Sequence, residues 1–191
     1  ELIGTLNTVI FCPEDLQRIK GTPSGRRRFL DMEISQTSAT YYHQLMQYNR
    51  LLQQRNAVLK EYRGKNTIPL EEWDLQLADM ASFIVKKRLE SLKKINLLID
   101  LMNRKLTGGL ENLTIGYEQP YMDNGSLEYT KEGFYERIKA ALPQDRHRLS
   151  TSVGPHRDDL RFFSDAMDLK KFGSQGQQRT AVLSFCLLYT S

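Results

Sequence analysis

The chain has 191 residues, of which 40% are hydrophobic and 26% are charged, and its net charge is +4. This composition is typical of a folded globular protein, and no apolar run approaches the ~20 residues that a membrane-spanning helix needs. The first residues do not resemble a signal sequence and the two cysteines are far apart, so we expect a cytoplasmic protein with no membrane partner.

The first third of the chain predicts short elements and carries the excess charge. Residues 2–11 predict a strand that ends before Pro13, and Pro13 with the two acidic residues after it predicts the start of a short helix. Ser24 is placed to cap a second helix that begins in the arginine run 26–28. Residues 1–65 contain ten Lys or Arg against six Asp or Glu, which accounts for the whole net charge.

A basic stripe of this kind is typical of proteins that contact nucleic-acid phosphates, although a solvated helix face is the alternative. The arginine run could instead form ion pairs with Asp31 and Glu33. We predict a DNA backbone contact for at least one member of the run, which consists of Arg26, Arg27 and Arg28.

Two long helices are predicted next. Apolar residues recur at heptad-like spacing over 45–64, interrupted by Arg55, and a second apolar pattern over 70–106 ends at two consecutive glycines. Joined by a short turn, these helices predict an antiparallel hairpin. Their aromatic residues are expected in the core and not as stacking platforms for bases: Tyr48, Trp73 and Phe83.

The remaining elements are shorter. We predict strands at 113–117 and 127–129 that pair across an Asp-Asn-Gly turn, a helix at 132–142 that Pro143 stops, and a strand at 160–163.

Residues 172–180, Phe-Gly-Ser-Gln-Gly-Gln-Gln-Arg-Thr, then open an apolar helical run. The first N–H groups of a helix are unpaired and carry the positive end of its dipole, so they attract anions. Gly173 and Gly176 allow a ligand to approach the backbone, Ser174 can cap the helix, and the stretch contains no carboxylate. A polar turn capping a surface helix is the alternative, but we predict a phosphate-binding loop.

This stretch resembles the Ser-x-Gly-Gln signature motif of ABC-type ATPases, and with Gln-Arg-Thr after it the stretch resembles the RecF family of bacterial recombination mediators. Other RecF-like stretches occur in family order along nearly the whole chain: Pro-Glu-Asp-Leu at 13–16 followed by arginines and Phe-Leu-Asp at 29–31, the Tyr-to-Asn helix at 48–56, and Gly-Pro-His-Arg-Asp-Asp-Leu at 154–160.

The resemblance implies an α/β (α+β) fold, a partial ABC-type ATPase head formed by residues 1–40 and 108–191 with a helical arm (lobe II) inserted at 41–107. It also implies that the signature residues bind ATP held by an opposing subunit, so that a homodimer forms with ATP. These nucleotide-binding residues would be Ser174, Gln175, Gly176 and Gln177. Nucleotide or dimer contacts are also expected from His156, Arg157 and Asp158.

A protein-kinase interpretation of His156-Arg157-Asp158 fails, because Phe163 stands where the kinase loop needs Asn and no Asp-Phe-Gly follows. No Gly-x-x-x-x-Gly-Lys-[Ser/Thr] loop and no Walker B strand occur either. We therefore expect the middle of a RecF-like protein. The parent would be a weak ATPase whose ATP and Mg²⁺ are bound mainly by other parts. For this chain we expect no catalytic residue, no metal site of its own and no ATP hydrolysis by itself. Residues 184–191 depart from the family and are expected to be non-native.

The resemblance further implies duplex and single-stranded or gapped DNA as partners, RecO and RecR as companions in loading recombinase, and roles in replication, recombination, repair and the SOS response. Two alternatives remain at this stage. One is a non-enzymatic nucleic-acid-binding helical scaffold. The other is an ABC-headed DNA protein of the SMC kind, against which the short arm argues.

Overall fold

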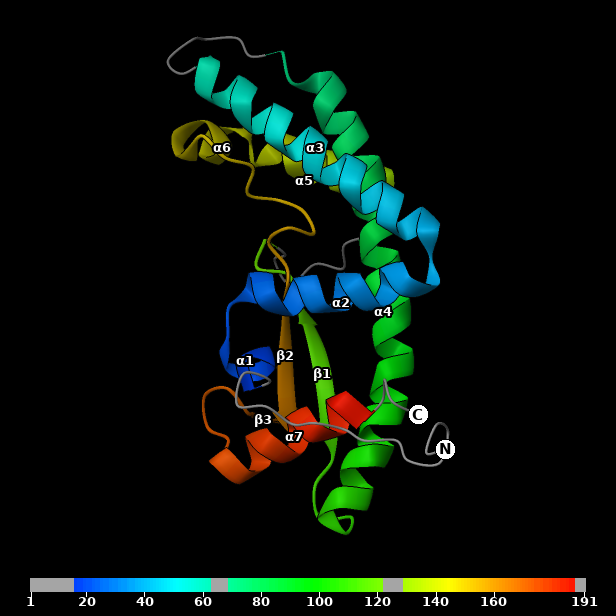
Figure 1. Cartoon of the computed structure of the whole chain (residues 1–191). Helices are drawn as coiled ribbons and strands as arrows, with labels where there is room; N and C mark the ends of the chain where they lie inside the picture. Colours follow the sequence, from blue (N-terminus) through cyan, green and yellow to red (C-terminus); the bar gives the residue numbers. More distant parts are fainter. Residues whose placement is uncertain (1–15, 63–68, 122–128, 188–191) are drawn as a thin grey trace, which may run out of the picture. The chain divides into compact units, whose positions relative to one another are not determined.

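The computed structural model describes residues 16–62, 69–121 and 129–187 (Figure 1). The strand predicted at 2–11, the helix start at Pro13 and the Asp-Asn-Gly turn lie outside these ranges. The elements form two compact units: Glu1–Phe29, Glu90–Glu118 and Asp159–Ser191 make the first, and Leu30–Leu89 and Gln119–Asp158 make the second.

These units do not coincide with the expected head and arm, which stay a prediction. The physical reason is α4 (Glu71–Thr107), one uninterrupted helix of which residues 71–89 pack in the second unit and residues 90–107 in the first. Gly108 and Gly109 end α4 with φ of 66° and 83°, as predicted, and the Gly109 N–H donates to the Arg104 carbonyl at 2.8 Å.

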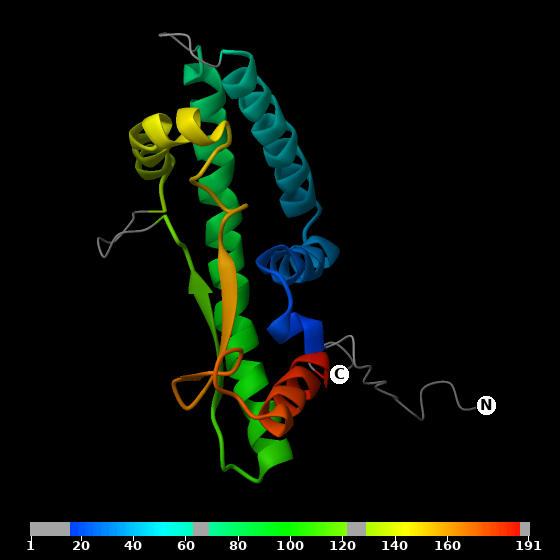
Figure 2. The ribbon, with the colours of Figure 1, turned by 90° about the vertical axis from the view of Figure 1, so that its left-hand side faces the viewer.

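The first unit is built on a three-stranded antiparallel sheet in the order β1-β2-β3. β1 (Leu113–Glu118) pairs with β2 (Asp159–Ser164), which confirms both predicted strands, and β3 (Met167–Asp168) pairs with β2. Asp165 and Ala166 both have positive φ, as a two-residue hairpin turn between twisted strands requires. Two views show α4 running alongside β1 (Figures 1 and 2).

Polar and aromatic side chains attach the helices of this unit to its sheet. Asn96 of α4 bonds both the N–H and the carbonyl of Ile115, at 2.7 and 2.9 Å, and so satisfies the free edge of β1. The ring of Phe185, on α7 (Gln175–Leu187), lies 5.6 Å from that of Phe162 and 4.8 Å from that of Phe29. The short α1 (Gln17–Lys20) buries Ile19 in the same unit.

The second unit is helical and contains the predicted hairpin. α3 (Ala39–Glu61) begins at the cap residue Ser38, and its buried Arg55 reaches Asp74 of α4 at 2.6 Å. Arg55 is therefore not part of a solvated basic stripe: it is fully buried, and it also donates to Asp145 at 2.7 Å and to Thr151 at 2.9 Å. A buried guanidinium is tolerated because two carboxylates surround it. Tyr48 is buried as predicted, whereas Trp73 and Phe83 are half-buried.

Two predicted boundaries are wrong, and proline explains both. α2 (Pro23–Thr37) begins one residue before Ser24, because Pro23 occupies the first helical position and Thr22 Oγ1 accepts from the Gly25 N–H. α5 (Lys131–Ala140) ends by itself, and Pro143 lies in the first turn of the next helix, α6 (Leu142–Arg148). No helix within the described ranges is both long and apolar enough to span a bilayer.

Candidate nucleotide-binding site

Ser174 and Gln177 close the N-terminus of α7 by bonding each other. The Gln177 N–H donates to Ser174 Oγ at 3.2 Å, and the Ser174 N–H donates to Gln177 Oε1 at 2.9 Å. This reciprocal pair is a capping box, so the predicted capping role of Ser174 is confirmed. The Ser174 hydroxyl accepts in this pair, which leaves its own proton available to an acceptor outside the chain.

Two adjacent backbone N–H groups in the first turn of α7 have no hydrogen-bond acceptor among the described residues. Residues 170–174 all donate their N–H groups within the segment, and the Gln178 N–H donates to the Ser174 carbonyl at 3.0 Å. Among the residues that the structure describes, no acceptor lies in bonding position for the N–H groups of Gln175 and Gly176. These two groups stand at the positive end of the α7 dipole, where an anion is favoured.

The two glycines of the loop differ in their surroundings. A Cβ at Gly173 would lie 2.6 Å from the Leu169 carbonyl oxygen, so packing within the chain requires glycine there. A Cβ at Gly176 would meet nothing closer than Ser174 Oγ at 3.8 Å, and the residue has helical backbone. Alanine at 176 would favour the helix by about 1 kcal/mol, so the fold of the chain does not explain this glycine. Without a side chain, position 176 leaves the two free N–H groups uncovered.

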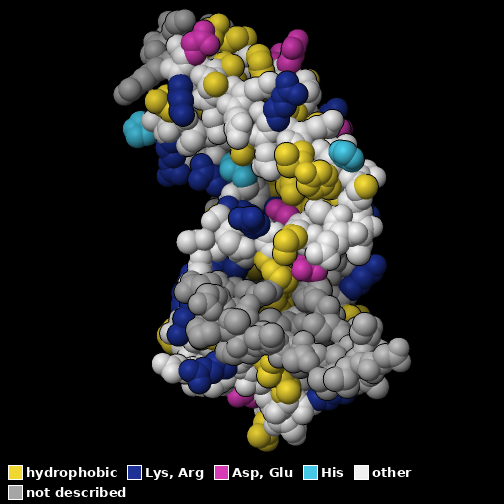
Figure 3. Space-filling view, viewed as in Figure 1, with side chains coloured by type: hydrophobic (Ala, Val, Ile, Leu, Met, Phe, Trp, Pro, Cys, Tyr) yellow, Lys and Arg dark blue, Asp and Glu magenta, His cyan; other side chains and the backbone are white. Residues whose placement is uncertain are grey.

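The surroundings of the loop are mainly basic. Lys170, Lys171 and Arg179 are exposed, and Figure 3 shows Lys and Arg side chains gathered along the edge of the first unit that carries α1 and the segment leading into α7. The fold brings in one carboxylate from elsewhere: Glu111 accepts from Gln177 Nε2 at 3.0 Å and from Ser164 Oγ at 3.1 Å. Sequence pattern gave no signal for this tertiary contact.

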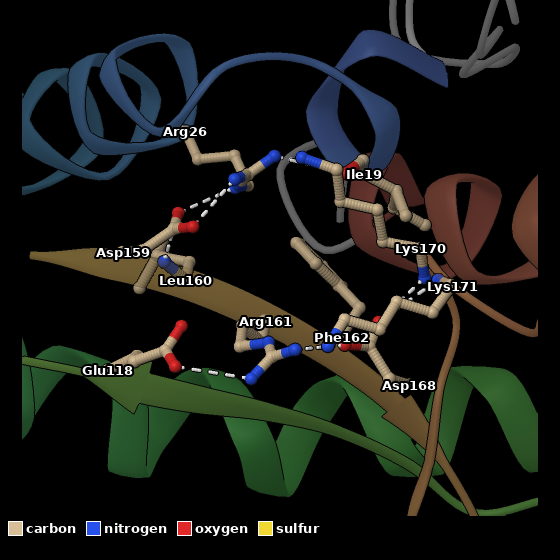
Figure 4. A pocket seen from close by; sticks show the side chains of 10 residues that line it. All are labelled: Ile19, Arg26, Glu118, Asp159, Leu160, Arg161, Phe162, Asp168, Lys170 and Lys171. Atoms are coloured by element: carbon tan, nitrogen blue, oxygen red, sulfur yellow. Dashed lines mark hydrogen bonds and ion pairs between the residues drawn. The ribbon is translucent and has the colours of Figure 1, made fainter. Parts of the chain in front are cut away.

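A polar pocket of about 410 Å³ lies beside the same segment (Figure 4). Arg161 crosses it from β2 and pairs with Asp168 at 2.5 Å and Glu118 at 3.2 Å. Arg26 forms a two-bond ion pair with Asp159, at 2.8 and 2.7 Å, on the opposite wall. Carboxylates thus neutralise the two arginines of the pocket, whereas the exposed Lys170 and Lys171 also line it.

The arginine run divides into one internal and two outer residues. Arg26 is 3% exposed, and in addition to Asp159 it donates to the carbonyls of Ile19 and Gly21. This geometry gives Arg26 a structural role. Arg27 is half-buried and has a contact of its own, and Arg28 is exposed. The predicted DNA contact stays a prediction for these two.

His156, Arg157 and Asp158 belong to the second unit, whereas Ser174 to Gln177 belong to the first. His156 Nε2 lies 3.0 Å from the Thr151 carbonyl and donates to it, and His156 Nδ1 forms a second hydrogen bond with the Tyr48 hydroxyl at 2.6 Å. Burial raises the pKa of Tyr48, so its hydroxyl stays protonated. Gly154, with φ of 131°, makes room for that hydroxyl.

The other two members of this triplet lie differently. Asp158 is fully buried, 3.8 Å from the guanidinium of Arg88, and Arg157 is exposed with its guanidinium donating to the Thr151 carbonyl. Arg157 is thus the most exposed member of the triplet.

The known proteins with similar sequences are RecF proteins. No family model matches the chain. The DNA replication and repair protein RecF of Alkaliphilus oremlandii is 46% identical over 189 residues, which cover 98% of this chain and 52% of that protein. RecF of Halothermothrix orenii is 42% identical with the same coverage. The chain is homologous to about half of a RecF protein.

Solved structures of RecF share this fold. The recombination mediator protein RecF in the RecFOR pathway, solved as RecF-ATPrS and as RecF-ATP, matches with a TM-score of 0.85 and 35% identity in each case. The match covers 97% or 98% of this chain and 51% of the RecF chains. The expected resemblance to RecF and the mixed α/β fold of an ABC-type ATPase are thereby confirmed, and the chain spans about half the length of the relatives that it matches.

Proposed function

We propose that this chain is the part of a RecF-type recombination mediator that binds the terminal phosphate of ATP held by a second copy. The observation that carries the proposal is the pair of free N–H groups at Gln175 and Gly176, at a helix N-terminus with no side chain over position 176. Two such donors and the Ser174 hydroxyl suit a phosphate. The solved RecF relatives contain ATP or ATPrS, which supports nucleotide as the ligand.

If ATP binds between two copies, dimerisation depends on the nucleotide, because ATP bound to one copy forms part of the surface that the second copy binds. The phosphate-binding loop with lysine that would hold ATP and Mg²⁺ in the first copy does not occur in this sequence, so other parts of RecF would supply it. The dimer would act on duplex or gapped DNA together with RecO and RecR.

The decisive experiment substitutes Ser174→Arg in a full-length RecF protein that contains this segment. A bulky cation over the free N–H groups should abolish ATP-dependent dimerisation, measured by light scattering after gel filtration. ATP binding by the monomer, measured by equilibrium dialysis, should stay within about twofold. Leu97→Arg is the matched control, because it places the same cation at a 72% exposed position of α4, outside the loop.

If the Ser174→Arg protein still dimerises with ATP, the trans role of this loop is wrong. If ATP changes neither the oligomeric state nor DNA binding of the unmodified protein, the segment is a nucleic-acid-binding scaffold instead.

A further inference from the structure

Gln178 is a buried polar side chain directly behind the nucleotide-binding loop. It is 3% exposed, and its Nε2 donates to the Leu169 carbonyl at 2.7 Å and to the Gly173 carbonyl at 3.1 Å. Both partners are acceptors, so the amide orientation is fixed. One side chain in the first turn of α7 therefore holds both ends of the 169–173 segment.

Asp168 holds the same segment from its other side. Its Oδ1 accepts from the N–H groups of Lys170 and Lys171, at 2.9 and 3.3 Å, and its carbonyl accepts from the Phe172 N–H at 2.9 Å. Its Oδ2 accepts from Arg161, which fixes the carboxylate against β2 (Figure 4). A carboxylate that bonds the N–H groups two and three residues ahead is a turn-forming device.

The segment between these two residues is fully constrained. Gly173 is pressed against Leu169, and its N–H donates to the Leu169 carbonyl at 3.2 Å. The N–H of Ser174 is bonded to Gln177. Every N–H from 170 to 174 is thus committed inside the chain, which sets where the free N–H groups of Gln175 and Gly176 point.

The polar character of Gln178 costs stability. Its Oε1 is buried and has no donor among the described residues, and a buried oxygen without a partner is unfavourable. A side chain needed only to fill space would be more stable as methionine, which has a similar length and no polar oxygen. The two carbonyl contacts of Nε2 are what glutamine adds.

We propose that Gln178 and Asp168 are positioning residues that preorganise the backbone donors for the phosphate of a nucleotide presented by a second copy. The proposal rests on the function proposed above for the same loop. Donors held in place before the ligand arrives bind it more tightly, because their ordering does not have to occur on binding.

The test uses full-length RecF containing this segment, with Gln178→Met as the main variant. The ATP concentration for half-maximal dimerisation should rise about tenfold or more. The ATP affinity of the monomer should be unchanged, and the melting temperature should change little, because the removal of the unpaired oxygen offsets the donor that the Leu169 and Gly173 carbonyls lose. A dimerisation curve equal to that of the unmodified protein overturns the proposal, and so does a loss of dimerisation that merely accompanies a lower melting temperature.

Two further variants separate positioning from packing. Asp168→Asn keeps an Oδ1 acceptor for the Lys170 and Lys171 N–H groups but loses the acceptor for Arg161, so it should retain more dimerisation than Asp168→Ala, which loses both. In Gln178→Glu a protonated carboxyl can donate to one carbonyl and an ionised one repels both, so its dimerisation should improve as pH falls. Equal behaviour of Asp168→Asn and Asp168→Ala, or a flat pH profile for Gln178→Glu, contradicts the assignment.

Hydrogen exchange measures the positioning independently of ATP. In Gln178→Met the amides of residues 170–174 should exchange about tenfold faster than in the unmodified protein. Unchanged exchange refutes the positioning role. Faster exchange in a protein that never dimerises with ATP supports the positioning and rejects the proposed function alone.

Discussion

Gly173 and Gly176, three residues apart at the N-terminus of α7, are glycine for unrelated reasons. At position 173 the backbone of Leu169 occupies the space that a Cβ would need, whereas at position 176 that space is open. The first glycine is thus required by the fold, whereas no contact within the described residues requires the second. A sequence pattern of two glycines cannot separate these roles, because the difference lies in contacts between residues and not in residue type.

The stability of full-length RecF containing this segment should respond oppositely to alanine at the two positions. Gly173→Ala should lower the free energy of unfolding by about 1–3 kcal/mol through overpacking. Gly176→Ala should leave it unchanged or raise it by up to about 1 kcal/mol through helix propensity. Urea unfolding followed by circular dichroism measures both. Equal destabilisation by the two substitutions would contradict the assignment.

Arg26 and Arg28 form a second contrasting pair, one inside the fold and one exposed. Arg28→Gln should weaken DNA binding and reduce the dependence of log affinity on log salt by about 1, as loss of one phosphate contact does. Arg26→Met should instead lower stability by about 3 kcal/mol, since it leaves Asp159 without its partner. Fluorescence anisotropy with a gapped DNA at several salt concentrations distinguishes the two, and an unchanged salt slope for Arg28→Gln removes that residue from the interface.

At the scale of single elements, helices with strong periodicity were predictable. The apolar pattern over 70–106 and the glycines after it locate α4 to within one residue at each end. Helix starts near proline were not predictable, because a proline can either end one element or stand in the first turn of the next. Pro23 and Pro143 both stand in a first turn. The register of β1 with β2 joins residues about 45 positions apart, and no local pattern specifies such a pairing.

The candidate site was predictable only where it depends on local sequence. The capping residue Ser174 and the open loop follow from local sequence. Asp168, Gln178 and Glu111 act through tertiary contacts, and their types and spacing give no local signal. The burial of Arg55 could not be predicted from the local pattern, because its two carboxylate partners lie on α4 and α6.

Docking of α4 on the sheet depends on Asn96, which bonds both backbone groups of Ile115. In full-length RecF, Asn96→Leu should lower the free energy of unfolding by about 1–3 kcal/mol, because two buried backbone groups lose their partner. Leu97→Ala, one residue away and 72% exposed, is the control and should change it by less than about 0.5 kcal/mol. If denaturant unfolding shows equal effects, Asn96 does not secure the edge of β1.

At the scale of the whole molecule, the proposed function gives the chain one half of a nucleotide site, without the loop that would first capture ATP. It carries Ser174 and the free N–H pair, and it contains no Gly-x-x-x-x-Gly-Lys-[Ser/Thr] loop. A chain with this set of site residues should bind a nucleotide only when another molecule presents it. By itself it should neither dimerise with ATP nor release phosphate from it.

This asymmetry predicts that the chain captures an ATP-loaded copy of full-length RecF. Tagged chain should retain full-length RecF on a column in the presence of a slowly hydrolysed ATP analogue and release it in ADP, because only the triphosphate extends to the loop of the second molecule. In excess, the chain should lower the steady-state phosphate release of full-length RecF. A dimer of one chain and one full-length copy contains a single composite ATP site, whereas a dimer of two full-length copies contains two. Chain carrying Ser174→Arg is the control and should do neither. Retention that is equal in ATP analogue and ADP would mean that the two molecules meet through another surface.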